Sequence, residues 1–403
     1  MKIRRLNQYR LFVFVCMFAF FIPHSISILA TDSSFWLTIY NVTAIFRCLI
    51  AVISISIFVL QQRKPSILVK CVFLYELSVF IACYFNGTIT FQFTITNCLT
   101  YLGLACFLQM EDCRHDEKFL DGITYFFGTM AIFGALSILL FPNGFNHGEM
   151  KKDAIYFLGS KNNGFFYFTI YLYLSVLQLY NKNKKITQYL IVLSCVFLCC
   201  TLITNSMTGF ITIFLTTGYL IITKHKSFLR RFLTPRKSIF VIAFVAALIP
   251  FLAQGKLDWA FQIIGRESDF SGRTRIWSSA IELIKQNPLW GNGKDGDVIL
   301  FHGHTQAHNI YIDYATKYGF ITLSIFILML ILIAVKMAKN TKKDLVYINA
   351  FFFFVFFFHS LFDSMTMSFI TMVLFYCQKD FNDTGRMENK ERVMLLKKRM
   401  SQY

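Results

Sequence analysis

The residues best suited to chemistry stand in one polar stretch, residues 255–317, of an otherwise apolar chain. Arg273 and Arg275 precede a short helical pattern, and His308 is followed by Asn309. A guanidinium is permanently charged and binds phosphate with two parallel hydrogen bonds, so it can hold a diphosphate leaving group without a metal ion. A histidine titrates near neutral pH and can accept a proton from a hydroxyl group. Together these residue types predict a site for an anionic phosphate substrate that must lose a proton.

Two other interpretations of this stretch stay open on the sequence alone. The two arginines could instead meet lipid headgroups or pair with Glu267 and Asp269. A metal site is suggested by His302, His304 and His308, since two histidines at positions i and i+4 can share an ion. Their spacing matches no recognised ligand pattern, however. We therefore predict that His302 and His304 are solvated loop residues, and that the protein uses neither a metal nor another cofactor.

Polar residues inside apolar segments are a second group of candidates. Arg47 lies in the outer half of a predicted membrane span, where a charge is costly and usually faces a cavity or a partner. The alternative is that its side chain reaches the outer headgroups. His359 and Asp363 flank the last predicted hairpin, where they either line the same outer cavity or cap helices.

The elements that must position these residues are predicted to be membrane-spanning helices. Only 15% of the 403 residues are charged, against about 25% in an ordinary soluble domain, and 56% are hydrophobic. We therefore predict an all-α polytopic membrane protein with about twelve spans of roughly 20 apolar residues each. Runs of phenylalanine such as residues 351–358 are expected to face lipid. The predicted spans are residues 11–30, 37–60, 66–85, 88–109, 119–141, 164–180, 188–205, 208–223, 238–254, 318–338, 345–362 and 365–378.

Basic residues concentrate in alternate connections, which predicts the orientation of the spans. The net charge of +18 is therefore explained by topology and does not point to nucleic acid, and both termini are predicted to be cytoplasmic. Segment 110–118 has a net charge of −2 but is also placed inside, because acidic residues contribute little to this rule. The other net charges are +4 for 1–10, +3 for 61–70, +3 for 181–187, +6 for 224–238, +3 for 336–344, +3 for 379–403, +1 for 142–163 and zero for 255–317.

The chain is accordingly divided into four parts. Within the large outer loop, apolar residues recur at helical spacing after position 275 and again over residues 305–318, so the loop should carry two amphipathic helices against the mouth of the membrane domain. The parts are residues 1–254 (nine helices, with the outer loop 142–163), 255–317 (the large extracytoplasmic loop), 318–378 (three helices) and 379–403 (a basic cytoplasmic tail).

Three motifs in this loop resemble the O-antigen polymerase and ligase superfamily. They are SGRTRIW at residues 271–277, NPLWGNG at 287–293 and AHNIY at 307–311. A weaker, similar element is FLGSKNN at residues 157–163, which opens a span after an outer loop. Within the superfamily, the whole most resembles a Wzy-type polymerase of capsule or O-antigen repeat units.

The resemblance implies a fold related to the GT-C glycosyltransferases and substrates carried on undecaprenyl diphosphate in a bacterial cytoplasmic membrane. The enzyme would join the reducing end of one lipid-linked glycan to the non-reducing end of another. Its expected partners are membrane lipids, a flippase and a chain-length regulator. By analogy, His308 is the base for the acceptor hydroxyl and Arg273 and Arg275 hold the diphosphate. Asn309 would orient the histidine or contact sugar. The substrate-binding candidates are Arg47, Asn162, Trp277, Asn309 and His359.

One departure from the family pattern affects the diphosphate site. Ligase-like members often have an arginine after a serine where this chain has Ser206 and Met207. Either Arg47 supplies that charge or the two sequences are not equivalent at this point. Two alternatives to the polymerase also remain: a ligase that moves a finished glycan to a lipid, a wall polymer or a protein, and a flippase or transporter of lipid-linked glycans.

Overall fold

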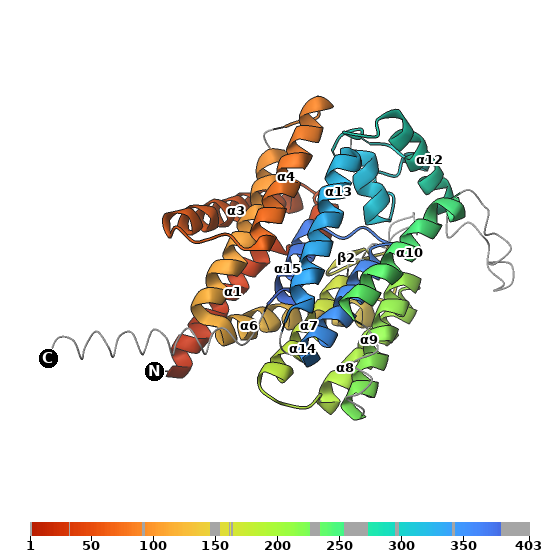
Figure 1. The fold of residues 1–403 in the computed structure, drawn as a ribbon. Coiled ribbons are helices and arrows are strands. Elements are labelled where there is room, and N and C mark those ends of the chain that lie inside the picture. Colours follow the sequence, from red (N-terminus) through yellow and green to blue (C-terminus); the bar gives the residue numbers. More distant parts are fainter. Residues whose placement is uncertain are drawn as a thin grey trace.

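The computed structural model describes residues 2–31, 33–90, 93–145, 154–160, 162, 164–225, 234–253, 273–294, 298–340 and 343–379. Helices dominate this part of the chain, which confirms the predicted all-α class (Figure 1). A short antiparallel pair, β1 (Ile155–Tyr156) and β2 (Gly159–Ser160), precedes α7. The helices are α1 (Lys2–Phe20), α2 (His24–Leu29), α3 (Ser34–Leu60), α4 (Ile67–Phe85), α6 (Thr100–Leu140), α7 (Gly164–Asn181), α8 (Gln188–Ile203), α9 (Met207–His225), α10 (Pro235–Ala253), α12 (Arg273–Gln286), α13 (Ile310–Ala338), α14 (Lys343–His359) and α15 (Met367–Cys377), with a π-helical turn η1 (Thr94–Leu99) and a 3-10 turn η4 (Phe301–Gly303).

Two predicted boundaries in the N-terminal half are wrong. The spans predicted at 88–109 and 119–141 are joined, because residues 110–118 continue α6 as one helix of 41 residues. That segment contains neither glycine nor proline, and five of its nine residues are of types that favour helix: Met110, Glu111, Arg114, Glu117 and Lys118. Conversely, the span predicted at 11–30 is broken after Phe20, where Pro23 precedes the short helix α2.

Several helices are long and apolar enough to cross a membrane. In the described chain four reach both the length and the hydropathy of a full span: α3, α4, residues 118–140 of α6, and α13. Five shorter apolar helices accompany them, including α8, α14 and α15. These features agree with a multi-pass membrane protein, while the number twelve and the GT-C relation stay predictions.

The phenylalanine run of α14 is buried, so the expectation that it faces lipid is wrong. Phe352, Phe353, Phe356 and Phe357 are at most 1% exposed. The reason is the position of α14, which packs against α7, α9, α10, α13 and α15. A helix that is apolar on every side is typical of such an interior position.

Contacts at one end of the helices bring together connections that were predicted to lie on the same side. Acidic residues of α6, two of them in segment 110–118 and one just after it, contact residues from segments distant in sequence there. The ion pair of Asp112 with Lys379 shows how a stretch of net charge −2 can share an end with positively charged connections. The contacts join Tyr9 Oη to Glu111 Oε2 (2.8 Å), Arg10 to Asp121 (3.7 Å), Lys182 Nζ to Asp121 Oδ1 (2.9 Å) and Lys379 Nζ to Asp112 Oδ1.

The two helices predicted in the large outer loop are present. The first is α12, and the second, which begins at Ile310 and not at 305, is the first segment of α13. Gly319 (φ 76°) separates this segment from the long remainder of α13. Figure 1 shows α12 and the start of α13 together at one end of the helices, above the labelled strand β2. Residues 254–272 of the loop, with Ser271 and Gly272 of the first motif, lie outside the described residues.

Candidate functional site

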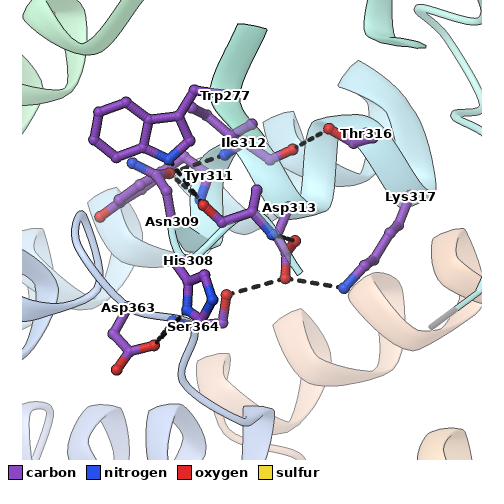
Figure 2. A network of polar contacts seen from close by, with 11 residues as sticks. Trp277, His308, Asn309, Tyr311, Ile312, Asp313, Thr316, Lys317, Asp363 and Ser364 are labelled. Atoms are coloured by element: carbon purple, nitrogen blue, oxygen red, sulfur yellow. Dashed lines mark hydrogen bonds and ion pairs between the residues drawn. The ribbon is translucent and has the colours of Figure 1, made fainter. Parts of the chain in front are cut away.

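The backbone that carries His308 is held from two sides (Figure 2). The indole Nε1 of the fully buried Trp277 donates to the carbonyl oxygen of Ala307 at 2.8 Å. Asn309, also fully buried, caps α13 by accepting from two backbone N–H groups of its first turn at 2.9 and 3.0 Å. The amide nitrogen of Asn309 donates to the carbonyl oxygen of Leu361 at 2.8 Å. Trp277 and Asn309 therefore position the histidine loop, and of the two roles predicted for Asn309 the geometry favours orienting the histidine.

The side chain of His308 faces the carboxylate of Asp363, which lies in the connection between α14 and α15. Its Nδ1 lies 3.4 Å from Oδ1 of Asp363, and its side chain is 30% exposed whereas that of Asp363 is 7% exposed. His308 has a φ of 48°, in the left-handed region, which costs free energy and is found at functional sites. With a carboxylate at Nδ1, the tautomer with a proton on that nitrogen is favoured, which leaves Nε2 able to accept a proton.

Positive groups surround Asp363. Burial by itself raises the pKa of this carboxyl, but the hydrogen bond with His308 and the charges of His359, His308 and Arg273 outweigh it, so the pKa lies below its ordinary value. Burial likewise lowers the pKa of Arg273, and the charge of Asp363 counteracts this. An arginine stays protonated at any physiological pH. The structure therefore brings three of the predicted site residues, His308, Arg273 and His359, around one carboxylate.

His359, the last residue of α14, is only 1% exposed. Its Nδ1 is 2.7 Å from the hydroxyl of Thr212 on α9, and its ring packs 4.5 Å from that of Phe166. Its Nε2 is buried and has no hydrogen-bond partner among the described residues. His359 therefore both links α14 to α9 and offers one unused ring nitrogen.

Asn162 is linked to the N-terminus of α9. The hydroxyl of Ser206 donates to Oδ1 of Asn162 at 2.7 Å and accepts from the backbone N–H of Gly209 at 3.3 Å. Gly209 must be a glycine for packing, because a Cβ there would lie 2.3 Å from the ring of Phe165. The side chain of Met207 is 46% exposed and brings no charge to this turn.

The second motif, residues 287–293, locks the break in α13. The backbone N–H of Gly293 donates to the carbonyl oxygen of Lys317 at 3.0 Å, and that of Phe320 to Pro288 at 2.8 Å. A Cβ on Gly319 would lie 2.1 Å from the carbonyl oxygen of Leu289, so the two chains approach in a way that only glycine permits. The motif thus fixes the end of the first segment of α13, the segment that directly follows the loop of His308.

Two other predicted site residues lie in different surroundings. The guanidinium of Arg275 lies 5.7 Å from the ring centre of Phe301. Arg47 is on α3, which packs mainly against α1, α2, α6 and η1, and its Nε is buried without a hydrogen-bond partner among the described residues. These contacts do not bring Arg47 to His308. His302 and His304 are exposed, as expected for solvated loop residues.

Asp363 is a polar residue of the last predicted hairpin but was not among the predicted site residues. Its signal was its place four residues after His359, yet nothing local showed that His308, 55 residues earlier, would face it. Within the described ranges, no group of three or more His, Cys, Asp or Glu side chains is arranged to hold a metal ion.

Comparison with known proteins gives one match. Residues 190–327, about a third of the chain, match the model of a family described as O-antigen ligase. The matched region runs from α8 into α13 and includes Arg273, Trp277 and His308, whereas Asp363 lies beyond it. No curated protein and no solved structure matches the chain.

Proposed function

We propose that the protein transfers a glycan from an undecaprenyl-diphosphate-linked donor to a glycan acceptor, because residues 190–327 match the model of a family described as O-antigen ligase. The reaction would take place at the outer face of a bacterial cytoplasmic membrane. The observation that carries the proposal is the pairing of His308 with Asp363 at 3.4 Å, beside the charge of Arg273. A base, its orienting carboxylate and a cation for phosphate are the groups that such a transfer requires.

The proposed step forms one bond and breaks another at the anomeric carbon of the donor. An acceptor hydroxyl attacks this carbon while Nε2 of His308 takes the hydroxyl proton. The bond to the diphosphate oxygen breaks, and the diphosphate leaves with the electron pair. Arg273, and Arg275 next to it in the helix, would stabilise the developing negative charge. Asp363 stabilises the imidazolium that forms at His308.

The polymerase reaction, in which both donor and acceptor are lipid-linked repeat units of a capsule or O-antigen, is the form that we favour on motif order. The description of the matched family supports a second form, in which a finished glycan is transferred to a lipid, a wall polymer or a protein. Both forms use the same base and the same diphosphate site. A flippase role has less support, since the candidate polar residues gather around one loop and no internal repeat is visible.

Deletion of the gene distinguishes these forms. Single repeat units on the carrier or at the surface are expected for a polymerase. Full-length chains retained on the carrier would indicate a ligase, and intermediates left on the cytoplasmic face would indicate a flippase.

The site assignment is tested with purified protein in nanodiscs and lipid-linked glycan extracted from the deletion strain. His308→Ala should lower glycan transfer by about 10²–10⁴-fold, the usual contribution of a general base. His302→Ala is the matched control, because His302 is an exposed histidine of the same loop whose ring packs on Phe301, and its loss should leave transfer unchanged. Normal transfer by a folded His308→Ala protein would rule out His308 as the base.

A further inference from the structure

A polar cavity of about 110 Å³ lies beside the proposed site and plays no part in the mechanism above. Its walls come from α4, η1, the start of α6, the first segment of α13 and the residues before α15. Two exposed residues, Gln306 and Thr366, also line it, so it reaches the surface near the histidine loop.

One wall of the cavity carries a buried acid without a full set of partners. Glu76 is 5% exposed, and its Oε1 has no hydrogen-bond partner in the described chain. A buried polar atom is costly to leave unpaired, so such an atom facing a cavity indicates a missing ligand or water. Because α4 is a candidate span, this acid is expensive in free energy, and a binding role would account for it.

The part of the wall that comes from α13 carries a buried ion pair. Lys317 Nζ lies 3.0 Å from Oδ2 of Asp313, and the two residues are 3% and 5% exposed. The same oxygen accepts from the hydroxyl of Ser364 at 3.0 Å (Figure 2). Removing two charges from water costs more than their attraction usually returns, so a buried pair of this kind is weak evidence for stability and points to another use.

Tyrosine rings also line the cavity. Tyr75 and Tyr314 have ring centres 5.4 Å apart, and Tyr314 and Tyr318 are 6.2 Å apart. Tyrosine presents an apolar face and a hydroxyl together, and carboxylate, ammonium and amide groups supply hydrogen bonds at the edges. A sugar ring has the matching surface, with C–H groups on its faces and hydroxyl groups around its rim.

Two residues that line the cavity, Asp313 and Ser364, are also connected to the site of His308. Oδ1 of Asp313 accepts from the backbone N–H of Ala307 at 2.6 Å, and Ser364 directly follows Asp363 in the chain. A ring held in the cavity would therefore lie next to the loop that bears the base. This proximity is what an acceptor needs when one of its hydroxyl groups must be delivered to a histidine.

We propose that this cavity binds one sugar ring of the acceptor glycan, and that the ring is uncharged or carries an amine. The inference rests on the proposed function. The ammonium of Lys317 is already paired with Asp313, and no other Lys or Arg lines the cavity, so the described lining offers no further cation to an anionic sugar. The volume is below the roughly 300–1,000 Å³ of sites that enclose a whole drug-sized ligand, so the cavity takes one end of a larger molecule.

The test uses full-length protein in nanodiscs and lipid-linked glycan extracted from a strain that lacks the gene. KM and kcat for transfer are measured for the wild type, Glu76→Gln and Tyr314→Ala. Each variant should raise KM for the glycan about tenfold or more and change kcat less than threefold. The glycan freed from its carrier by mild acid should inhibit the wild type, and inhibit the variants correspondingly less. Inhibition by undecaprenyl diphosphate alone should be the same in all three.

Leu77→Ala is the control, because Leu77 neighbours Glu76 on α4 but is 42% exposed on the outside of the helix. Glu76→Gln keeps the size of the side chain and removes a buried ionisable group, so loss of folding is not expected from it. If the wild type transfers glycan while Glu76→Gln and Tyr314→Ala keep a normal KM, the cavity is not a sugar site. If the variants instead alter inhibition by undecaprenyl diphosphate, the cavity holds the carrier and the proposal is wrong. If the wild type transfers no glycan at all, the proposed function itself fails, which is a different result.

Discussion

Nδ1 of His308 and Oδ1 of Asp363 lie 3.4 Å apart, although 55 residues separate them in the chain. His308 directly precedes the N-cap of α13, and Asp363 follows the end of α14. Trp277 and Asn309 hold the loop of His308 in place by hydrogen bonds to Ala307 and Leu361. A carboxylate in this position sets the orientation and the tautomer of the histidine.

Replacing Asp363 by asparagine tests this pairing. Asp363→Asn keeps the shape of the side chain but removes the charge that stabilises the imidazolium. We expect glycan transfer to fall by about 10²–10⁴-fold in kcat with little change in KM. The measurement is steady-state transfer of lipid-linked glycan in nanodiscs. A variant with wild-type kcat would show that the pairing is only structural.

The carboxyl group of Asp363 should make the stability of the folded protein depend on pH. Its pKa in the folded protein lies below the ordinary value of about 3.9, so the folded state holds this proton more weakly than the unfolded chain. The stabilisation is therefore complete above that ordinary value and is lost as the pH falls through the folded pKa. We expect the Tm of the wild type to exceed that of Asp363→Asn at pH 6, with the difference shrinking below pH 4. A difference that stays constant down to pH 3 would contradict this.

The glycine at the break in α13 should be intolerant of any side chain. Gly319→Ala places a Cβ 2.1 Å from the carbonyl oxygen of Leu289 at a φ of 76°. The backbone conformation alone costs about 1–3 kcal/mol, and the collision adds to it. Gly218→Ala on α9 is the control, since no atom lies within 4 Å of its added Cβ, and it should be neutral or stabilising by up to about 1 kcal/mol. Denaturant unfolding in detergent micelles measures both, and equal effects at the two positions would refute the packing argument.

Breaking the buried ion pair should destabilise the protein strongly. Lys317→Met leaves Asp313 without its cation, and truncation of one partner of a buried pair costs about 3–5 kcal/mol. The double variant Lys317→Met with Asp313→Asn should recover part of this loss, because no uncompensated charge remains. The unfolding free energies of the wild type, Lys317→Met, Asp313→Asn and the double variant form a double-mutant cycle. Strictly additive losses would mean that the two residues are not coupled.

Loss of Arg273, which is proposed to bind the diphosphate, should lower glycan transfer more than loss of Arg47 on α3. Arg273→Gln should lower kcat/KM about 10–100-fold, the loss of one charge-assisted contact of about 1.5–3 kcal/mol. Arg47→Gln should change it less than threefold, because α3 packs mainly against α1, α2, α6 and η1. Inhibition by undecaprenyl diphosphate gives an independent reading of the same contact. A tenfold loss in Arg47→Gln would instead restore Arg47 to the site.

Composition and charge alone determined the class of this protein. An apolar chain must use helices in lipid, and basic residues mark one set of connections, so the helical architecture and most helix positions follow from local properties. The same local signals predicted the chemistry in residues 255–317, with Arg273 at the start of one helix and His308 just before the next. The failures were also local in origin. The charges of residues 110–118 predicted a connection, but the helix propensity of the segment prevailed. Within it, Asp112 pairs with Lys379 and Glu111 accepts a hydrogen bond from Tyr9.

Only the tertiary structure decided which polar residues meet. The pairing of His308 with Asp363, the burial of the phenylalanines of α14 and the acid of Glu76 facing a cavity all depend on contacts between segments distant in sequence. No periodicity or spacing carries that information, because the direction in which a residue points is set by the packing of several helices at once. The sequence therefore suggested His308 and Arg273 as candidates for a base and a cation for phosphate, and the packing of α12, α13 and α14 brought them to the same carboxylate.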